Sequence, residues 1–320
     1  MSVPQVYWGR PLPRGVKVRK ACLIINPAAG PTKARPDWWV VIDPLREAGW
    51  WVTQAQTTGS GSAGQLARQA IADGCKLIVV AGGDGTINEA IQPMVGSDAV
   101  LGLIPVGTAN ILARELGIPP DPAKAGKALV NGCVSHLDLG LVTAPGNVSR
   151  YFCEMVGIGF DAAIVAGILP ELKVTLGKGA YVLTALQTSF THRPARVQLI
   201  IDGKRLRRLV YMFVISNTRL YGADFLEIIP EANASDGVFH GALFRGQSFW
   251  LAWRDFFALT IKRLKELTDV EFFTFRRVEV RSVKPIPYQI DGDLAGTTPI
   301  TVEIVPHALR VMLPLTKENC

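Results

Sequence analysis

The first 130 residues alternate short apolar runs with amphipathic stretches. Buried strands are predicted where an apolar, partly β-branched run of strand length lies between polar turns. Such runs occupy 21–25, 50–56, 77–81 and 100–105. Helical periodicity separates or follows them at 37–48, 65–73 and 121–130. Strands that alternate with helices in this way predict a parallel, doubly wound sheet.

From about residue 136 the pattern changes to strands that are punctuated by Asp-Gly and Gly-Asn turns. The predicted strands are 137–142, 150–156, 196–201, 206–216, 238–244, 272–283, 288–290, 300–305 and 308–313. Helices are predicted only at 161–168, 180–190 and 247–267. Many strands with few helices predict a mainly antiparallel β-sandwich.

The predicted fold class is therefore α/β plus all-β. An N-terminal doubly wound, Rossmann-like nucleotide-binding domain is expected over 18–135, and a C-terminal antiparallel β-sandwich domain over 136–320. The last residues of the chain could return to the first domain.

The stretch KLIVVAGGDGTINEA, residues 76–90, carries the clearest chemical signal. A strand runs into the three glycines Gly82, Gly83 and Gly85, and a helical pattern follows. Thr86 and Glu89 have the spacing of a capping box, which predicts that a helix begins at Thr86. A helix N-terminus offers free N–H groups and a positive dipole end to phosphate oxygens. Glycines let such a ligand approach the backbone closely.

Asp84 stands among these glycines and adds a carboxylate that can hold Mg²⁺ directly or through water. The alternative is a tight strand–helix turn in which Asp84 is only a cap. Three glycines around one acid favour the phosphate interpretation.

The composition of the chain indicates which classes of partner it could bind and in which compartment it would lie. The chain has 320 residues, 48% of them hydrophobic, a net charge of +7 and a pI near 9.2. The charge favours anionic partners, namely nucleotides, nucleic acid or an acidic membrane surface. The five scattered cysteines suggest neither a metal site nor a disulfide framework, and therefore a reducing compartment. No signal peptide and no apolar run long enough to span a membrane is recognised, so we expect a soluble cytoplasmic protein.

A second glycine-rich segment, residues 57–64, contains the pattern GxGxxG, and Asp84 follows its last glycine by twenty residues. This spacing is that of the dinucleotide fingerprint of oxidoreductases. The glycines, however, follow the second strand instead of the first. The acid also lies within another glycine turn, where a ribose-binding acid is not expected. We therefore disfavour an oxidoreductase.

A candidate general base lies near the C-terminus, in Asp291-Gly292-Asp293. Asp202-Gly203 resembles it, but Lys204 follows it and it is predicted to be a simple hairpin turn. Asp291-Gly292 could be the same kind of turn. The second carboxylate favours function, because two acids that flank one glycine repel each other unless they share a cation or a proton.

Taken together, these stretches resemble the diacylglycerol kinase and sphingosine kinase superfamily, in particular its bacterial soluble lipid kinases. The GGDGT segment matches most specifically. The resemblance extends from Asn26 to Asp293 through five ordered motifs, although Ala29, Ile111 and Asp293 replace the Ser, Asp and Glu that the family commonly carries.

The resemblance implies a set of nucleotide contacts. They are Asn26, Pro27 and Gly30 of an NPxxG turn, Thr57 or Thr58, the loop and helix residues Gly82, Gly83, Asp84, Gly85, Thr86, Asn88 and Glu89, and Thr108 of a GTAN turn. Asp84 would also hold the Mg²⁺ that travels with ATP. A structural Mg²⁺ is implied at the Asp236 carboxylate and at the carbonyls of Asn233 and Val238. Asp291 and Asp293 would supply the base, and their roles stay unassigned.

The expected activity is that of an ATP- and Mg²⁺-dependent kinase that phosphorylates a hydroxyl group of a lipid such as diacylglycerol. Two alternatives stay open: a related kinase of a soluble substrate such as NAD, and a nucleotide- or lipid-binding protein without turnover.

The expected partner is a lipid at the inner membrane surface, met by peripheral association. Two features suggest this, the basic hairpin Lys204, Arg205, Arg207 and Arg208, and the aromatic helix 247–267. No nucleic-acid partner is expected, and a homodimer stays open.

Overall fold

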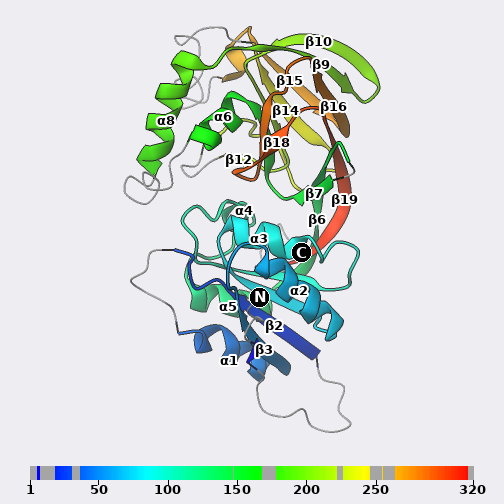
Figure 1. Ribbon diagram of the computed structural model, residues 1–320. Helices are drawn as coiled ribbons and strands as arrows, with labels where there is room; N and C mark the ends of the chain where they lie inside the picture. The colour runs from blue at the N-terminus through cyan, green and yellow to red at the C-terminus, as the bar shows by residue number, and fades with distance from the viewer. Residues whose placement is uncertain are drawn as a thin grey trace. The chain divides into compact units, whose positions relative to one another are not determined.

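The chain folds into two compact units in a computed structural model that describes residues 6–7, 19–30, 37–146, 148–167, 178–221, 226–245, 254 and 264–315 (Figure 1). Unit 1 comprises Met1–Leu137 and His307–Cys320, and unit 2 comprises Asp138–Pro306.

Unit 1 is built on a largely parallel sheet. Its strands are β1 (Val6–Tyr7), β2 (Arg19–Ile25), β3 (Trp50–Gln56), β4 (Leu77–Gly82), β5 (Val100–Pro105) and the end of β19 (Ile300–Leu313). The order across the sheet is β1-β3-β2-β4-β5-β19; β1 pairs antiparallel with β3, and the neighbours from β3 to β19 pair parallel. The strands β2 and β4 carry near-continuous buried apolar residues, as strands covered on both faces require.

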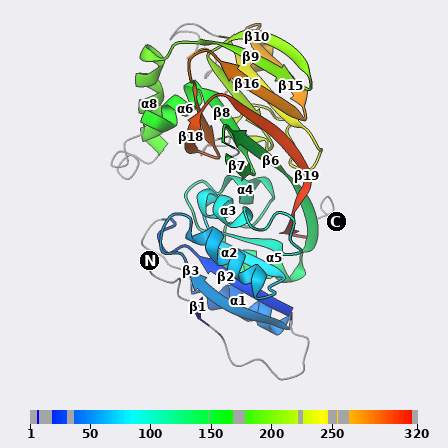
Figure 2. The same cartoon turned by 45° about the vertical axis from the view of Figure 1, so that its right-hand side comes forward.

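Helices cover this sheet in two pairs (Figure 2). One pair is α1 (Trp39–Glu47) with α5 (Pro122–Asn131), and the other is α2 (Ser62–Ala72) with α3 (Asp84–Ile91). The short α4 (Ile111–Glu115) follows β5. Because right-handed crossovers lead from β2 to β3 in one direction and from β3 to β4 in the other, the two pairs lie on opposite faces. This confirms the predicted doubly wound α/β fold.

Unit 2 is a sandwich of antiparallel sheets. One sheet has the order β15-β14-β11-β8-β17-β18, and in the other β19-β16-β9-β10 follow one another. Their facing sides share a core that includes Phe152, Phe213, Phe239 and Phe275. The strands are β6 (Cys133–Ala144), β7 (Val148–Phe152), β8 (Met155–Gly159), β9 (Ala195–Ile201), β10 (Lys204–Val210), β11 (Met212–Ser216), β12 (Leu220–Tyr221), β13 (Leu226–Glu227), β14 (Phe239–Phe244), β15 (Val270–Phe275), β16 (Arg277–Ser282), β17 (Pro287–Ile290) and β18 (Asp293–Thr297). The predicted antiparallel sandwich is confirmed.

Three predicted strands are in fact pairs of strands. The runs 150–156, 206–216 and 272–283 divide into β7 and β8, β10 and β11, and β15 and β16. The last two runs divide at a single residue, Tyr211 or Arg276, and there the chain passes from one sheet to the other. An apolar run indicates that a segment is buried, but not in which sheet it lies. The positions at which the chain changes sheets therefore leave no signal in the apolar pattern. Conversely, the predicted strands 300–305 and 308–313 form the single strand β19.

The helices of unit 2 are α6 (Phe160–Gly167), α8 (Lys178–Thr191) and the 3-10 turn η1 (Leu264–Glu266). The predicted helix 247–267 lies outside the described residues except for Arg254 and residues 264–267. Within the described part of the chain, no helix is long and apolar enough to cross a membrane.

The cysteine prediction needs one correction. Cys133 is disulfide-bonded, whereas Cys22, Cys75 and Cys153 are free and buried. The expectation of a reducing compartment therefore no longer follows from the cysteines.

Candidate active site

A pocket of about 590 Å³ lies at the carboxyl ends of the parallel strands in unit 1. Four loops line it, those after β2, β3 and β5 and the junction of β4 with α3. The strand order reverses between β2 and β4, and this switch point is where doubly wound sheets bind ligands. The volume lies within the range of small-molecule sites, about 300–1,000 Å³.

Glycines let the walls of this pocket meet backbone to backbone. A Cβ atom at Gly30, whose φ is +77°, would lie 2.1 Å from the carbonyl oxygen of Val106. A Cβ atom at Gly107 would lie 2.4 Å from the Cα atom of Gly83. No larger residue fits at either position without moving a loop, so these glycines fix the relative placement of three pocket walls.

The helix that enters the pocket begins earlier than the sequence pattern predicts. α3 starts at Asp84 with Gly83 as its N-cap residue, and no side chain caps it. The predicted capping box of Thr86 and Glu89 is therefore wrong, because both residues lie within the helix. The Thr86 hydroxyl instead accepts a hydrogen bond from the Asn26 side-chain amide at 2.8 Å.

The acids of α3 cap its neighbours. The Glu89 carboxylate accepts the backbone N–H groups of Gly61 at 2.7 Å and Ala63 at 3.2 Å, at the start of α2. The Asp84 carboxylate accepts the N–H of Leu112, in the first turn of α4, at 3.3 Å. The N-terminus of α3 keeps its own positive dipole end without a side-chain cap, at the edge of the pocket. This arrangement suits an anionic ligand there.

The pocket brings most of the predicted nucleotide contacts together. Its lining includes Asn26, Pro27, Gly30, Thr57, Thr58, Gly83, Gly85, Thr86, Glu89 and Thr108. Gly82, Asp84 and Asn88 do not line it; Gly82 ends the buried strand β4, and Asn88 is buried within α3. Sequence reasoning missed the lining residues Ala28, Ala29, Gly59, Ser60 and Gly107. Their only signal was their place within the same loops.

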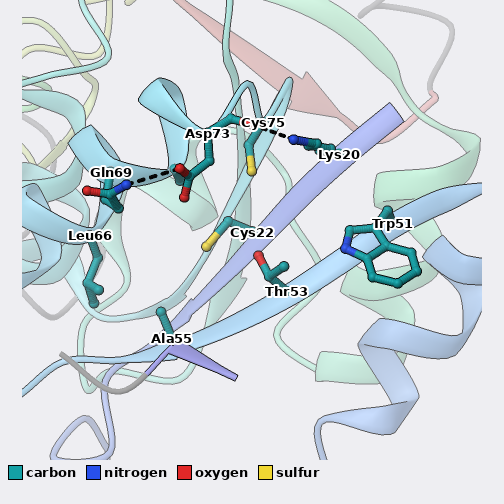
Figure 3. Close-up of a pocket in the computed structure, with 10 residues that line it drawn as sticks. Lys20, Cys22, Trp51, Thr53, Ala55, Leu66, Gln69, Asp73 and Cys75 are labelled. Carbon is teal, nitrogen blue, oxygen red and sulfur yellow. Dashed lines mark hydrogen bonds between the residues drawn. The ribbon is translucent and has the colours of Figure 1, made fainter. Parts of the chain in front are cut away.

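A second cavity, beside β2 and β3, is too small for a nucleotide (Figure 3). Its volume is about 40 Å³, enough for about one water molecule. Cys22 and Cys75 line it, and burial raises the pKa of their thiols to about 12 and about 11. Because only the thiolate is a good nucleophile, these cysteines are chemically quiet in the folded protein.

In unit 2, Asp291 and Gly292 form the turn between β17 and β18, with φ values of +47° and +83°. The Asp291 carboxylate accepts the backbone N–H groups of Cys153, Glu154 and Met155, at 3.0, 3.0 and 2.9 Å. Both of its oxygens thus hold the corner between β7 and β8.

The turn at Asp202-Gly203, between β9 and β10, uses its aspartate in the same way. Asp202 and Gly203 have φ values of +45° and +84°, and the Asp202 carboxylate accepts the N–H groups of Arg276 and Arg277. The first aspartate of both turns is therefore a structural acceptor.

Asp293 has different surroundings. Its side chain is 57% exposed and accepts a hydrogen bond from the Arg150 guanidinium at 2.9 Å. An ion pair this exposed contributes at most about 1 kcal/mol, so it orients the carboxylate without withdrawing it from solvent. Of the two acids, Asp293 is the more exposed.

The turn predicted to hold a structural metal places Asp236 beside His240. One Asp236 carboxylate oxygen accepts the Val238 N–H at 3.1 Å, and the other lies 3.0 Å from Nε2 of His240. The Asn233 carbonyl lies in the same turn and accepts the Asp236 N–H. A carboxylate and carbonyls are the hard donors that Mg²⁺ takes, and a cation here would share the carboxylate with His240. No cluster of three or more acidic, His or Cys side chains suited to a metal occurs within the described residues.

Family models match both units. Residues 20–142 match the diacylglycerol kinase catalytic domain, and residues 154–313 match the YegS C-terminal NAD kinase beta sandwich-like domain. This pairing defines a phosphotransferase with a hydroxyl group as acceptor. The chain belongs to the diacylglycerol kinase-like family of lipid kinases, which confirms the resemblance.

Individual proteins are similar to this chain over nearly its whole length. A diacylglycerol kinase of Bacillus subtilis is 29% identical over 305 residues, which cover 94% of this chain and 98% of that protein. A Pseudomonas putida protein named "Probable lipid kinase YegS-like" is 30% identical over 92% of this chain and 96% of its own length. A crystal structure of a diacylglycerol kinase from Bacillus anthracis superposes with a TM-score of 0.75 at 22% identity, covering 93% of this chain and 98% of that one.

Gly85 offers the sharpest test of the pocket. It lines the pocket and is not at positive φ, and a Cβ atom there would meet nothing within 4 Å. We expect Gly85→Val to keep the far-UV circular dichroism spectrum but to lose the rise in melting temperature that Mg·ATP gives the wild type, because the side chain would fill the anion's place. Ala72→Val, at the exposed end of α2, is the matched control and should keep the rise. An undiminished rise in Gly85→Val would show that the nucleotide binds elsewhere.

Chelation tests the predicted metal at Asp236. A ligand that binds only the native state stabilises it, so EDTA should lower the melting temperature of the nucleotide-free wild type. Asp236→Ala should start lower and respond no further to EDTA. Equal EDTA effects on the two proteins would remove Asp236 from any metal site.

Proposed function

We propose that the protein is an ATP- and Mg²⁺-dependent lipid kinase that transfers the γ-phosphate to a hydroxyl group of diacylglycerol or a related lipid. The observation that carries this proposal is the α3 N-terminus, which faces a nucleotide-sized pocket with no side-chain cap of its own. The names of the curated relatives support the lipid substrate.

The phosphates would lie against the backbone N–H groups of Gly83 and Gly85, with Asn26, Thr86 and Thr108 around them. When bound, Mg²⁺ would neutralise phosphate charge, and the Asp84 carboxylate, which does not line the pocket, would hold it through water. The hydroxyls of Thr57 and Thr58 and the Glu89-capped start of α2 would form the opposite wall.

Asp293 is our candidate for the general base. As the lipid oxygen forms its bond to the γ-phosphorus, the bond from that phosphorus to the β–γ bridging oxygen breaks, and ADP leaves. The proton of the attacking hydroxyl group passes to the Asp293 carboxylate, which Arg150 orients. Asp291 takes no part in this transfer, because backbone N–H groups occupy both of its oxygens.

The lipid would be met at the inner membrane surface, on the cytoplasmic side where ATP is supplied. The net charge of +7 favours an anionic surface, and each Lys or Arg near such a surface contributes about 1 kcal/mol. Within the basic hairpin, Arg208 pairs with Glu271, which leaves Lys204, Arg205 and Arg207 as its exposed cations. The aromatic residues of 247–267 that suggested a lipid contact, among them Trp250 and Phe256, lie outside the described residues.

A soluble substrate such as NAD is the second candidate. It is favoured by one observation, namely that the family model matching residues 154–313 is described as NAD kinase beta sandwich-like.

The decisive experiment supplies γ-³²P-ATP and Mg²⁺ with a panel of lipids in anionic vesicles, and separately with NAD. We expect the label to enter the organic phase over many turnovers, and less so at high salt, because exposed charges are screened. Label in the aqueous product would favour the NAD alternative. No catalytic incorporation on any substrate would leave a binding protein.

Substitutions of three aspartates test the division of roles. Asp293→Asn should keep the stability of the wild type and lower kcat by about 10²–10⁴-fold, because base catalysis is lost. Asp291→Asn should instead destabilise unit 2 by about 1–3 kcal/mol, since an amide cannot accept all three N–H groups. Urea denaturation and initial-rate assays measure the two effects.

Asp202→Asn is the matched control for Asp291→Asn, because it removes the same kind of acceptor from the same kind of turn. It should lower stability and leave kcat near that of the wild type. If Asp293→Asn retained normal turnover, the base would lie elsewhere in the chain.

A further inference from the structure

A buried carboxylate that the proposed reaction does not use lies behind the Asp291–Asp293 turn. Asp161, in the first turn of α6, is 6% exposed, and burial raises its pKa. The neighbouring strand makes room for it, because a Cβ atom at Gly157 would lie 1.7 Å from an Asp161 carboxylate oxygen.

Asp161 begins a continuous chain of hydrogen bonds that ends in the turn. One carboxylate oxygen accepts the Tyr221 hydroxyl, and the other accepts the side-chain amide of Gln289 at 2.7 Å. Gln289 lies on β17 and is 2% exposed. Its carbonyl oxygen accepts the backbone N–H of Gly292 at 2.7 Å. Each group in this chain has a partner, as buried polar groups require.

The turn itself does not need this network. The turn at Asp202-Gly203 has the same φ values and the same use of its aspartate, yet the residue two positions before that aspartate is Ile200 instead of a glutamine. An apolar residue at that position is therefore compatible with the hairpin. Buried polar networks are costly when incomplete and often no more stable than apolar packing. Formation of the hairpin therefore does not account for the network from Asp161 to Gly292, and the network needs another explanation.

The two turns differ also in the residue that follows the glycine, which is Asp293 in one and Lys204 in the other. The Gly292 N–H belongs to the peptide between Asp291 and Gly292, and it donates its hydrogen bond to Gln289. This bond holds the turn one residue before Asp293 and so limits the positions that Asp293 can take. From the exposed side, Arg150 holds the carboxylate itself. Gln289 thus holds the backbone just before Asp293 from the interior, and Arg150 holds the Asp293 carboxylate from the exposed side.

We propose that Gln289, held by Asp161, is a positioning residue that sets the orientation of Asp293 for phosphoryl transfer. This inference rests on the proposed role of Asp293 as the base. A displacement of about 1 Å can cost about 10²-fold in rate, so a loosened turn should lower kcat. The KM for ATP should not change, because the nucleotide pocket is built from unit 1 alone.

A donor–acceptor exchange between the two side chains tests this coupling. Gln289→Glu sets a second carboxylate against Asp161, and we expect kcat to fall by roughly 10–100-fold. The double variant D161N/Q289E restores a matched pair, because the amide introduced at position 161 would donate to the carboxylate introduced at position 289. That carboxylate would still accept the Gly292 N–H. We expect kcat to return to within about threefold of the wild type.

Two further measurements separate positioning from mere stability. Amide hydrogen exchange in a peptide covering 288–295 should quicken in Q289E and recover in the double variant. Val278→Ala, which truncates a buried core side chain on β16 and removes no hydrogen bond of the network, should lower the melting temperature and leave kcat unchanged at assay temperature. If Q289E does not fold, Gln289→Met removes both hydrogen bonds without adding charge and should show the same loss.

The outcomes also distinguish this inference from the proposed function. An active wild type with unaltered kcat in both Gln289 variants would overturn the positioning role, as would unaltered exchange in 288–295. A wild type that phosphorylates no substrate would overturn the proposed function, and with it the positioning of a base, even if the exchange results show that the network holds the turn.

Discussion

The N-terminus of α3 is the constraint on which unit 1 depends. The Asp84 and Glu89 carboxylates of this helix accept N–H groups at the starts of two other helices, and no side chain caps its own N-terminus by a hydrogen bond. Gly83, the N-cap residue, has no side chain that could accept the first N–H groups of the helix. The close approach of Gly83 to Gly107 holds this end of the helix in place. A phosphate bound as we propose would therefore meet a helix end whose surroundings are already held by hydrogen bonds within the protein.

In unit 2, the three residues of the Asp291–Asp293 turn have three different kinds of surroundings. Asp291 ties the turn to the corner between β7 and β8, Gly292 ties it to the interior through Gln289, and Asp293 reaches solvent. The Asp202 turn shows that the first of these bonds belongs to the hairpin. The likeness of the whole Asp-Gly-Asp segment to a family motif does not separate its two acids, whereas their contacts in the structure do.

The fold class and the loops of the pocket could be predicted from the sequence because they depend on local signals, such as buried apolar runs and glycines at strand ends. The predicted helix start at Thr86 failed because Glu89 satisfies α2, a partner that no local spacing reveals. β18 was missed because its residues are mostly exposed and give no apolar run. The difference between Asp291 and Asp293, and the link from Asp161 to Gln289, depend on contacts more than 100 residues apart in the chain. Such contacts cannot be read from composition or periodicity.

The two cysteines that line the cavity beside β2 and β3 can be used to measure how often this part of unit 1 opens. Cys22 and Cys75 are buried, and their raised pKa values keep them protonated at neutral pH. An alkylating reagent can therefore modify them only when this part of unit 1 opens. When closing is fast, the labelling rate is the intrinsic thiol rate multiplied by the open fraction. The labelling rates of the two native thiols thus report, without an engineered cysteine, how often this part of the unit 1 sheet opens.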